Sequence, residues 1–165
     1  MISKVEEMLI KMIKSIYLFS SFSDEEILDI AKDFKLEYVP SSTVLIKEGE
    51  IAPNIFIFKS GSWEVRKWFG LKKVILGTVG PGSIVGEMSL LTGKPAVASV
   101  VVKTDSEIWQ IGREKFLEFL NSHPHIKKEI EKIVAQRQKS NEEKLKQMES
   151  SVDPSLNDLD LNIYL

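Results

Sequence analysis

Cysteine is absent from the 165-residue chain, and this absence excludes several kinds of site. A chain without thiols forms no disulfide, no thiolate zinc site and no cysteine nucleophile, and it suits a reducing compartment. Histidine is nearly as scarce, because only His123 and His125 occur, beside an expected helix start where such residues are usually capping or surface groups. A metal centre built from several histidines inside a β-barrel is therefore excluded.

Long apolar runs are missing too. Glu6 and Glu7 interrupt the segment where a signal peptide would need an apolar stretch, and no later run is long enough to cross a bilayer. The 22 basic and 24 acidic residues nearly balance, so the net charge of −2 favours neither nucleic acid nor an anionic membrane as a partner. We expect a cytoplasmic protein with no nucleic-acid partner and no membrane insertion.

The motifs of common enzyme classes are also absent. No Ser/His/Asp arrangement and no pair of catalytic carboxylates is evident, and the glycine-rich stretch 77–86 lacks the Gly-Lys-Ser/Thr ending of a P-loop. The sequence therefore predicts a protein that is not an enzyme and has no cofactor.

Glycine is confined to the middle of the chain, where all nine lie between Gly49 and Gly112. Because glycine permits tight turns and weakens helix interiors, the middle should be turn-rich β-structure and the flanks helical. The length and the 43% apolar content allow one sizeable core but not two full domains. We predict one domain over residues 1–149, made of N-terminal helices (1–37), a β-roll (38–112) and C-terminal helices (113–149).

The flanks carry helical patterns. Ser23 and Glu26 form a capping-box pattern at the start of an N-terminal helix. In the C-terminal flank a long helix carries one apolar stripe, which we weigh as a homodimer seam: Ile126, Ile130, Ile133 and Val134. Residues 150–165 hold three Asp and no Lys or Arg, which predicts a disordered acidic tail, with an apolar anchor at Ile163, Tyr164 and Leu165.

The middle should contain short strands separated by turns, which suits a compact roll or barrel. The fold class expected is α+β, mainly β. The predicted strands are Val44 to Lys47, Ile55 to Phe58, Ser62 to Trp68, Lys73 to Val79, Ala96 to Val102 and Glu107 to Ile111. The run from Ile55 to Phe58 is apolar throughout, which suggests burial on both faces.

The segment 80–100 carries the chemistry. Turns at Gly80 to Gly82 and at Gly93 to Pro95 enclose a single helical turn from Glu87 to Leu91, preceded by Gly86. Backbone N–H groups at the start of a helix suit a phosphate, and the Glu87 carboxylate can accept from ribose hydroxyls. The sequence predicts a pocket that holds both a phosphate and a sugar.

The sequence Gly-Glu-Met-Ser-Leu-Leu-Thr-Gly-Lys-Pro, from Gly86 to Pro95, resembles the phosphate-binding cassette of the cyclic-nucleotide-binding family. The similarity extends to Lys47–Glu50, Ile55–Gly61 and Gly112–Phe116. It implies a double-stranded β-helix, a jelly-roll-like β-roll flanked by N-terminal helices and a long C-terminal helix, with cAMP or cGMP as candidate ligand. The residues implied to bind are Val85, Gly86, Glu87, Met88, Ser89, Lys94, Pro95, Ala96, Val97 and Ala98.

The cassette departs from the family at Ala96, where the resemblance calls for an arginine that grips the cyclic phosphate. A charge-assisted hydrogen bond contributes roughly 1.5 to 3 kcal/mol, so its loss weakens binding by about one to two orders of magnitude. We favour a stand-alone regulatory module with weakened or lost nucleotide affinity that contacts an unidentified protein partner through its C-terminal helix. Two alternatives stay open: a working cAMP sensor that holds the phosphate with Lys94 and backbone amides, and an oligomerisation or interaction protein without a small ligand.

Overall fold

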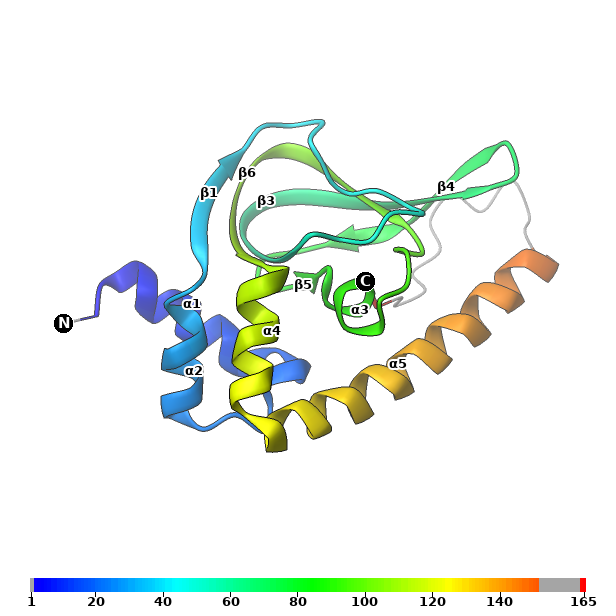
Figure 1. Ribbon diagram of the computed structural model, residues 1–165. Coiled ribbons are helices and arrows are strands. Elements are labelled where there is room, and N and C mark those ends of the chain that lie inside the picture. The colour runs from blue at the N-terminus through cyan, green and yellow to red at the C-terminus, as the bar shows by residue number, and fades with distance from the viewer. Residues whose placement is uncertain (1, 152–163) are drawn as a thin grey trace.

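The computed structural model describes residues 2–151, the side chains of 150 and 151 apart, and residues 164–165. A β-roll forms one layer, and helices from both flanks cover it on one side (Figure 1). The expected fold class, an α+β roll flanked by helices, is confirmed. The division of the chain at residue 149 stays a prediction.

Within the described residues, six strands form one antiparallel sheet. Two long strands, β3 (Asn54–Phe69) and β6 (Ser99–Gly112), pair along most of their length. Four shorter strands join them, with β4 (Lys72–Val79) and β5 (Ile84–Val85) on β3, and β1 (Lys35–Val39) and β2 (Val44–Ile46) on β6.

The expectation of separate strands at 55–58 and 62–68 is wrong, because β3 runs through both. Its pairing with β6 is irregular between Phe58 and Trp63, where the strand bends. Gly61 lies in this bend with a φ of +111°, and a Cβ there would collide with Ser106 of β6. Glycine at this position lets the two long strands curve together into a roll. β6 likewise runs continuously and begins at Ser99 rather than Ala96.

Alternate residues of β3 face two different cores. Ile55 and Ile57 pack against the helices, whereas Phe56 and Phe58 point into the roll, where the Phe58 ring stacks on Trp63 with centroids 3.8 Å apart. The predicted burial of this run on both faces is confirmed. One strand therefore connects the interior of the roll with the helical layer.

The N-terminal helices are α1 (Lys4–Ser15), the 3₁₀ turn η1 (Tyr17–Phe19) and α2 (Asp24–Ala31). The capping box at Ser23 and Glu26 is confirmed, since the Ser23 hydroxyl accepts from the Glu26 amide and the Glu26 carboxylate accepts from the Ser23 amide. These short helices bring Tyr17 to the edge of the roll.

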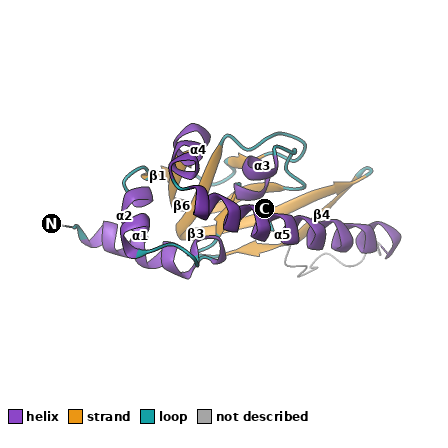
Figure 2. Ribbon diagram, turned by 60° about the horizontal axis from the view of Figure 1, so that its bottom comes forward, coloured by secondary structure: helices purple, strands orange, loops and turns teal. Residues whose placement is uncertain are grey.

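The C-terminal helices are α4 (Arg113–Ser122) and the long α5 (Pro124–Ser151), which passes beside α3 (Glu87–Thr92) (Figure 2). Ile126, Ile130 and Val134 are buried within the chain, so these three residues of the predicted dimer seam are covered intramolecularly. The burial continues to Met148. The expected disordered tail falls mostly outside the described residues, but Tyr164 and Leu165 lie against the body. None of the described helices is both long and apolar enough to cross a membrane.

Candidate functional site

The predicted helical turn after Gly86 is present as α3, which begins directly after β5. Gly86 caps it in a left-handed conformation with φ of +96°, and a Cβ at this position would collide with the carbonyl oxygen of Asn54. Only glycine fits both constraints without strain, so the backbone passes unusually close to β3 here.

Glu87, the first residue of α3, is buried with 1% of its surface exposed. Its Oε1 accepts a hydrogen bond of 2.9 Å from the Tyr17 hydroxyl, and its Oε2 has no hydrogen-bond partner among the described residues. Burial raises the pKa of this carboxyl to about 7, although the Tyr17 hydrogen bond opposes the shift. The Tyr17 pKa is also raised, chiefly by burial and then by the charge of Glu87. The site thus holds a carboxyl group with spare hydrogen-bonding capacity.

The side chains of the next two predicted residues make contacts within the protein. Met88 is buried in the helical core. The Ser89 hydroxyl accepts from the Ala52 amide at 3.0 Å and donates to the Lys94 carbonyl at 2.8 Å. The Ser89 side chain therefore ties α3 to the start of β3 and to the returning chain.

The returning chain carries the remaining predicted residues. Lys94 and Pro95 are exposed, whereas Ala96 is buried and Ala98 lies fully inside the roll. The Ala96 amide donates to the Glu50 carbonyl, and the Ala96 carbonyl accepts from the Gly49 amide, both at 2.9 Å. Both backbone groups of Ala96 are thus held by the Glu48–Glu50 turn.

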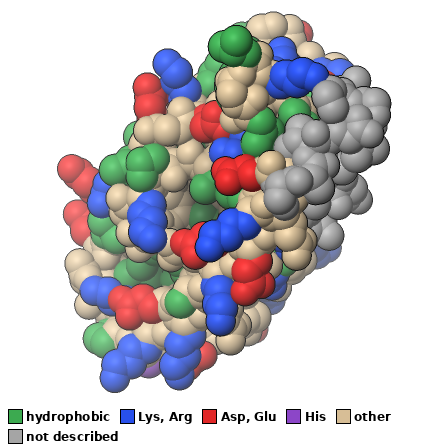
Figure 3. Space-filling view, turned by 90° about the vertical axis from the view of Figure 1, so that its right-hand side faces the viewer, with side chains coloured by type: hydrophobic (Ala, Val, Ile, Leu, Met, Phe, Trp, Pro, Cys, Tyr) green, Lys and Arg blue, Asp and Glu red, His purple; other side chains and the backbone are tan. Residues whose placement is uncertain are grey.

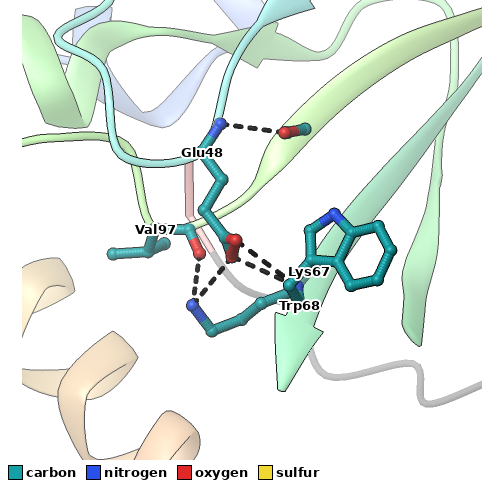
Figure 4. A network of polar contacts seen from close by, with 5 residues as sticks. Glu48, Lys67, Trp68 and Val97 are labelled. Carbon is teal, nitrogen blue, oxygen red and sulfur yellow. Dashed lines mark hydrogen bonds and ion pairs between the residues drawn. The ribbon is translucent and has the colours of Figure 1, made fainter. Parts of the chain in front are cut away.

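A polar network that the sequence analysis missed fixes the same turn (Figure 4). The Lys67 ammonium donates to Glu48 Oε1 at 3.0 Å and to the Val97 carbonyl at 2.7 Å, and the Glu48 amide donates to Ser99 Oγ. The alternation of β3 in the sequence gave no sign that Lys67 points toward the cassette. Its charge therefore holds in place the chain that returns after α3, at Val97.

A cavity of about 280 Å³ opens between the cassette and α5. A second cavity of about 340 Å³ lies on the Tyr17 side and includes Val85 and Glu87 in its lining. Tyr164 and Leu165 line both cavities, and the C-terminus lies beside α3 (Figure 1). Of the ten predicted residues, the first cavity is lined by Met88, Ser89, Lys94, Pro95, Ala96 and Val97.

On the face shown in Figure 3, basic and acidic side chains alternate and neither sign gathers into a patch. Within residues 2–151 and 164–165, no group of three or more His, Asp or Glu side chains is placed to hold a metal ion. The two cavities beside the cassette offer space for a small ligand.

Known proteins resemble this chain in sequence. The sequence model described as "Cyclic nucleotide-binding domain" matches residues 36–123. The potassium channel KAT3 of Arabidopsis thaliana is 27% identical over 110 residues, which is 67% of this chain and 17% of the channel. A cGMP-dependent protein kinase of Toxoplasma gondii is 31% identical over 109 residues, which is 66% of this chain and 11% of the kinase. The chain thus spans less than a fifth of the length of either relative.

A solved structure shares the fold. The regulatory domain of Toxoplasma gondii PKA, crystallised with cAMP, superimposes with a TM-score of 0.69 at 23% identity. The superposition covers 88% of this chain and 52% of that one. The uncovered 12% of this chain is shorter than either helical flank, so the superposition includes helical residues from both flanks as well as the roll.

Proposed function

Because this chain belongs to the cyclic nucleotide-binding domain family, we propose that it is a non-catalytic regulatory module whose cassette has weakened or lost affinity for cyclic nucleotides. The observation that carries the proposal is the environment of Ala96. Its small side chain stands where the family arginine is expected, and its backbone is fixed by Gly49 and Glu50.

The charged residues that line the cavity are expected to bind a phosphate only weakly. Lys94 is the one basic side chain among the described residues that line it, and the acidic Glu142 lines it from α5. Lys67 is already bound to Glu48 and the Val97 carbonyl. An anion in this cavity would meet one exposed lysine, which lacks the planar fork of arginine, and one carboxylate.

The long helix α5 is the element best placed to pass on the state of the pocket. It contributes Gln138, Asn141 and Leu145 to the lining and packs against α3. A ligand that fills the cavity would therefore contact both the cassette and this helix. We propose that a protein partner senses α5.

An arginine restored at position 96 tests the defect. We expect Ala96→Arg to bind cAMP at least tenfold more tightly than Ala96→Gln, which adds bulk without charge, and Lys94→Ala to leave the affinity of the natural chain unchanged. Calorimetric titration with cAMP measures all three variants, and circular dichroism confirms that each folds. Equal affinities of the two position-96 variants, or loss of cAMP binding in Lys94→Ala, would contradict the proposal, and the latter would favour the Lys94-based sensor.

A further inference from the structure

The backbone of Tyr164 is recognised by one buried side chain of α5. Asn141 is 4% exposed, and its amide donates to the Tyr164 carbonyl at 2.6 Å while its Oδ1 accepts from the Tyr164 amide at 2.9 Å. A two-way pair of this kind satisfies the donor and the acceptor of the same residue. It holds the backbone of Tyr164 in a fixed position along the helix.

The Tyr164 ring lies among cations and a second aromatic ring. The Arg137 guanidinium is 3.9 Å from the ring centroid and the Lys144 ammonium is 5.4 Å from it. The ring of Tyr17, which holds Glu87 through its hydroxyl, is 5.7 Å away. Cation–π contacts of this kind contribute most where the ring is shielded from water. Tyr164 is thus bound through its ring as well as its backbone.

Leu165 lies between the cassette and α5, where it lines both cavities. Its side chain is 5% exposed and belongs to the same apolar cluster as Val85, Ala96 and Met148. Its carbonyl oxygen accepts a 2.8 Å hydrogen bond from the Gly86 amide. That amide stands at the start of the cassette, among the backbone groups expected to meet a ligand.

We propose that Tyr164–Leu165 is an internal ligand of the cassette pocket and that a cyclic nucleotide must displace it. The site binds an aromatic residue followed by an aliphatic one. The Asn141 side-chain amide binds the backbone of Tyr164, the Gly86 amide binds the Leu165 carbonyl, and an apolar cluster surrounds the Leu165 side chain. Because Tyr164 and Leu165 line both cavities, their departure would join the two spaces into one larger pocket.

Two consequences follow from this arrangement. A bound internal segment lowers the apparent affinity of any competitor in proportion to the fraction of molecules in which the segment is released. The same segment joins α5 to Gly86, so its release removes a contact between the helix and the cassette. The competing ligand rests on the proposed function, whereas the binding of the segment to the cassette does not.

Amide hydrogen exchange of the nucleotide-free protein tests the binding of the segment. We expect the Gly86 amide to exchange at least tenfold faster in the double variant Tyr164→Ala/Leu165→Ala, which removes both side-chain anchors. A second variant, Asn141→Ala, should have the same effect from the opposite side. The matched control Tyr38→Ala/Leu71→Ala changes the same residue types at positions that are 65% and 98% exposed, and should leave the Gly86 amide unchanged. Equal exchange in all four proteins would overturn the inference, whatever the protein binds.

Titration of cAMP into the same double variant tests the competition. We expect its affinity to rise at least tenfold over the natural chain, while the Tyr38/Leu71 control binds like the natural chain. A Gly86 amide that is released without any gain in cAMP affinity would overturn the competition. Tight binding of cAMP by the natural chain would instead contradict the proposed function, so the two failures are distinguishable.

Discussion

The hydroxyl of Tyr17 donates a 2.9 Å hydrogen bond to Oε1 of Glu87 and so connects the N-terminal 3₁₀ turn to the first residue of the cassette helix. The two residues are 70 positions apart in the chain. Their contact fixes α3 from the side of the N-terminal helices, while α5 packs against it from another side. The helices of both flanks therefore meet at the cassette.

Removing the Tyr17 hydroxyl should loosen this connection. We expect Tyr17→Phe to lower the free energy of unfolding by about 1–2 kcal/mol, because a buried carboxyl group loses its hydrogen-bond donor. Urea denaturation measures the loss. Tyr38→Phe is the matched control, because Tyr38 is 65% exposed, and should change stability little. Equal effects of the two substitutions would show that the contact with Glu87 contributes nothing.

The titration of Glu87 predicts a pH dependence of stability. Its pKa in the folded protein, about 7, lies above the ordinary value of 4.5. Between these values the unfolded chain has lost the proton that the folded protein keeps, so this group's stabilising contribution is complete below pH 4.5 and is lost as the pH rises through 7. Relative to the natural protein, Glu87→Gln should gain up to about 3 kcal/mol from pH 4.5 to above 7.

Denaturation curves of the natural protein and Glu87→Gln across this pH range provide the measurement. Because glutamine keeps an oxygen that accepts from Tyr17, the two proteins differ mainly in the titrating proton. Parallel pH profiles would contradict an elevated pKa at Glu87.

Because Gly86 lies close to the Asn54 carbonyl, adding a methyl group at position 86 should strongly destabilise the fold. Gly86→Ala combines a left-handed backbone with a collision against the Asn54 carbonyl, and we expect it to destabilise the fold by at least about 2 kcal/mol. Gly70→Ala is the matched control, since Gly70 is also left-handed, at φ of +61°, but has open space around it. It should cost about 1 kcal/mol. Equal losses in thermal denaturation would contradict the predicted collision.

The network of Lys67, Glu48 and Val97 should stabilise the chain that returns after α3. Lys67→Met keeps the length of the side chain but leaves the Val97 carbonyl and the Glu48 carboxylate without this donor, which should cost about 1–3 kcal/mol. A double-mutant cycle with Glu48→Gln measures the coupling between the two side chains. Strict additivity of the two substitutions would show that the ion pair is not coupled.

Local patterns predicted much of the fold. The capping box at Ser23, the two-sided burial of Ile55 to Phe58 and the turn of helix after Gly86 all depend on residues close in sequence. Strand β1 was missed although Leu36 and Tyr38 alternate with Lys35 and Glu37, because the segment is only five residues long and four of them are exposed. The two-residue β5 is too short to leave a pattern.

The cassette could be located from sequence, but the partners of its side chains could not. The role of Ser89 at a ligand stays a prediction, but the sequence did not reveal that its hydroxyl bonds to the Ala52 amide and the Lys94 carbonyl. The contacts of Tyr17 with Glu87 and of Asn141 with Tyr164 join distant parts of the chain, and only the packed structure determines them. The sequence predicted an apolar anchor at 163–165 but not where it binds. Leu165 is buried, and Ile163 lies outside the described residues.

Direct titration tests whether the cassette has weakened or lost affinity for cyclic nucleotides. Calorimetry with cAMP and with cGMP on the ligand-free natural protein should give no saturation below roughly millimolar concentration, which corresponds to a binding free energy of only about −4 kcal/mol. Saturable binding at micromolar concentration of either nucleotide would contradict the account and identify a working second-messenger sensor.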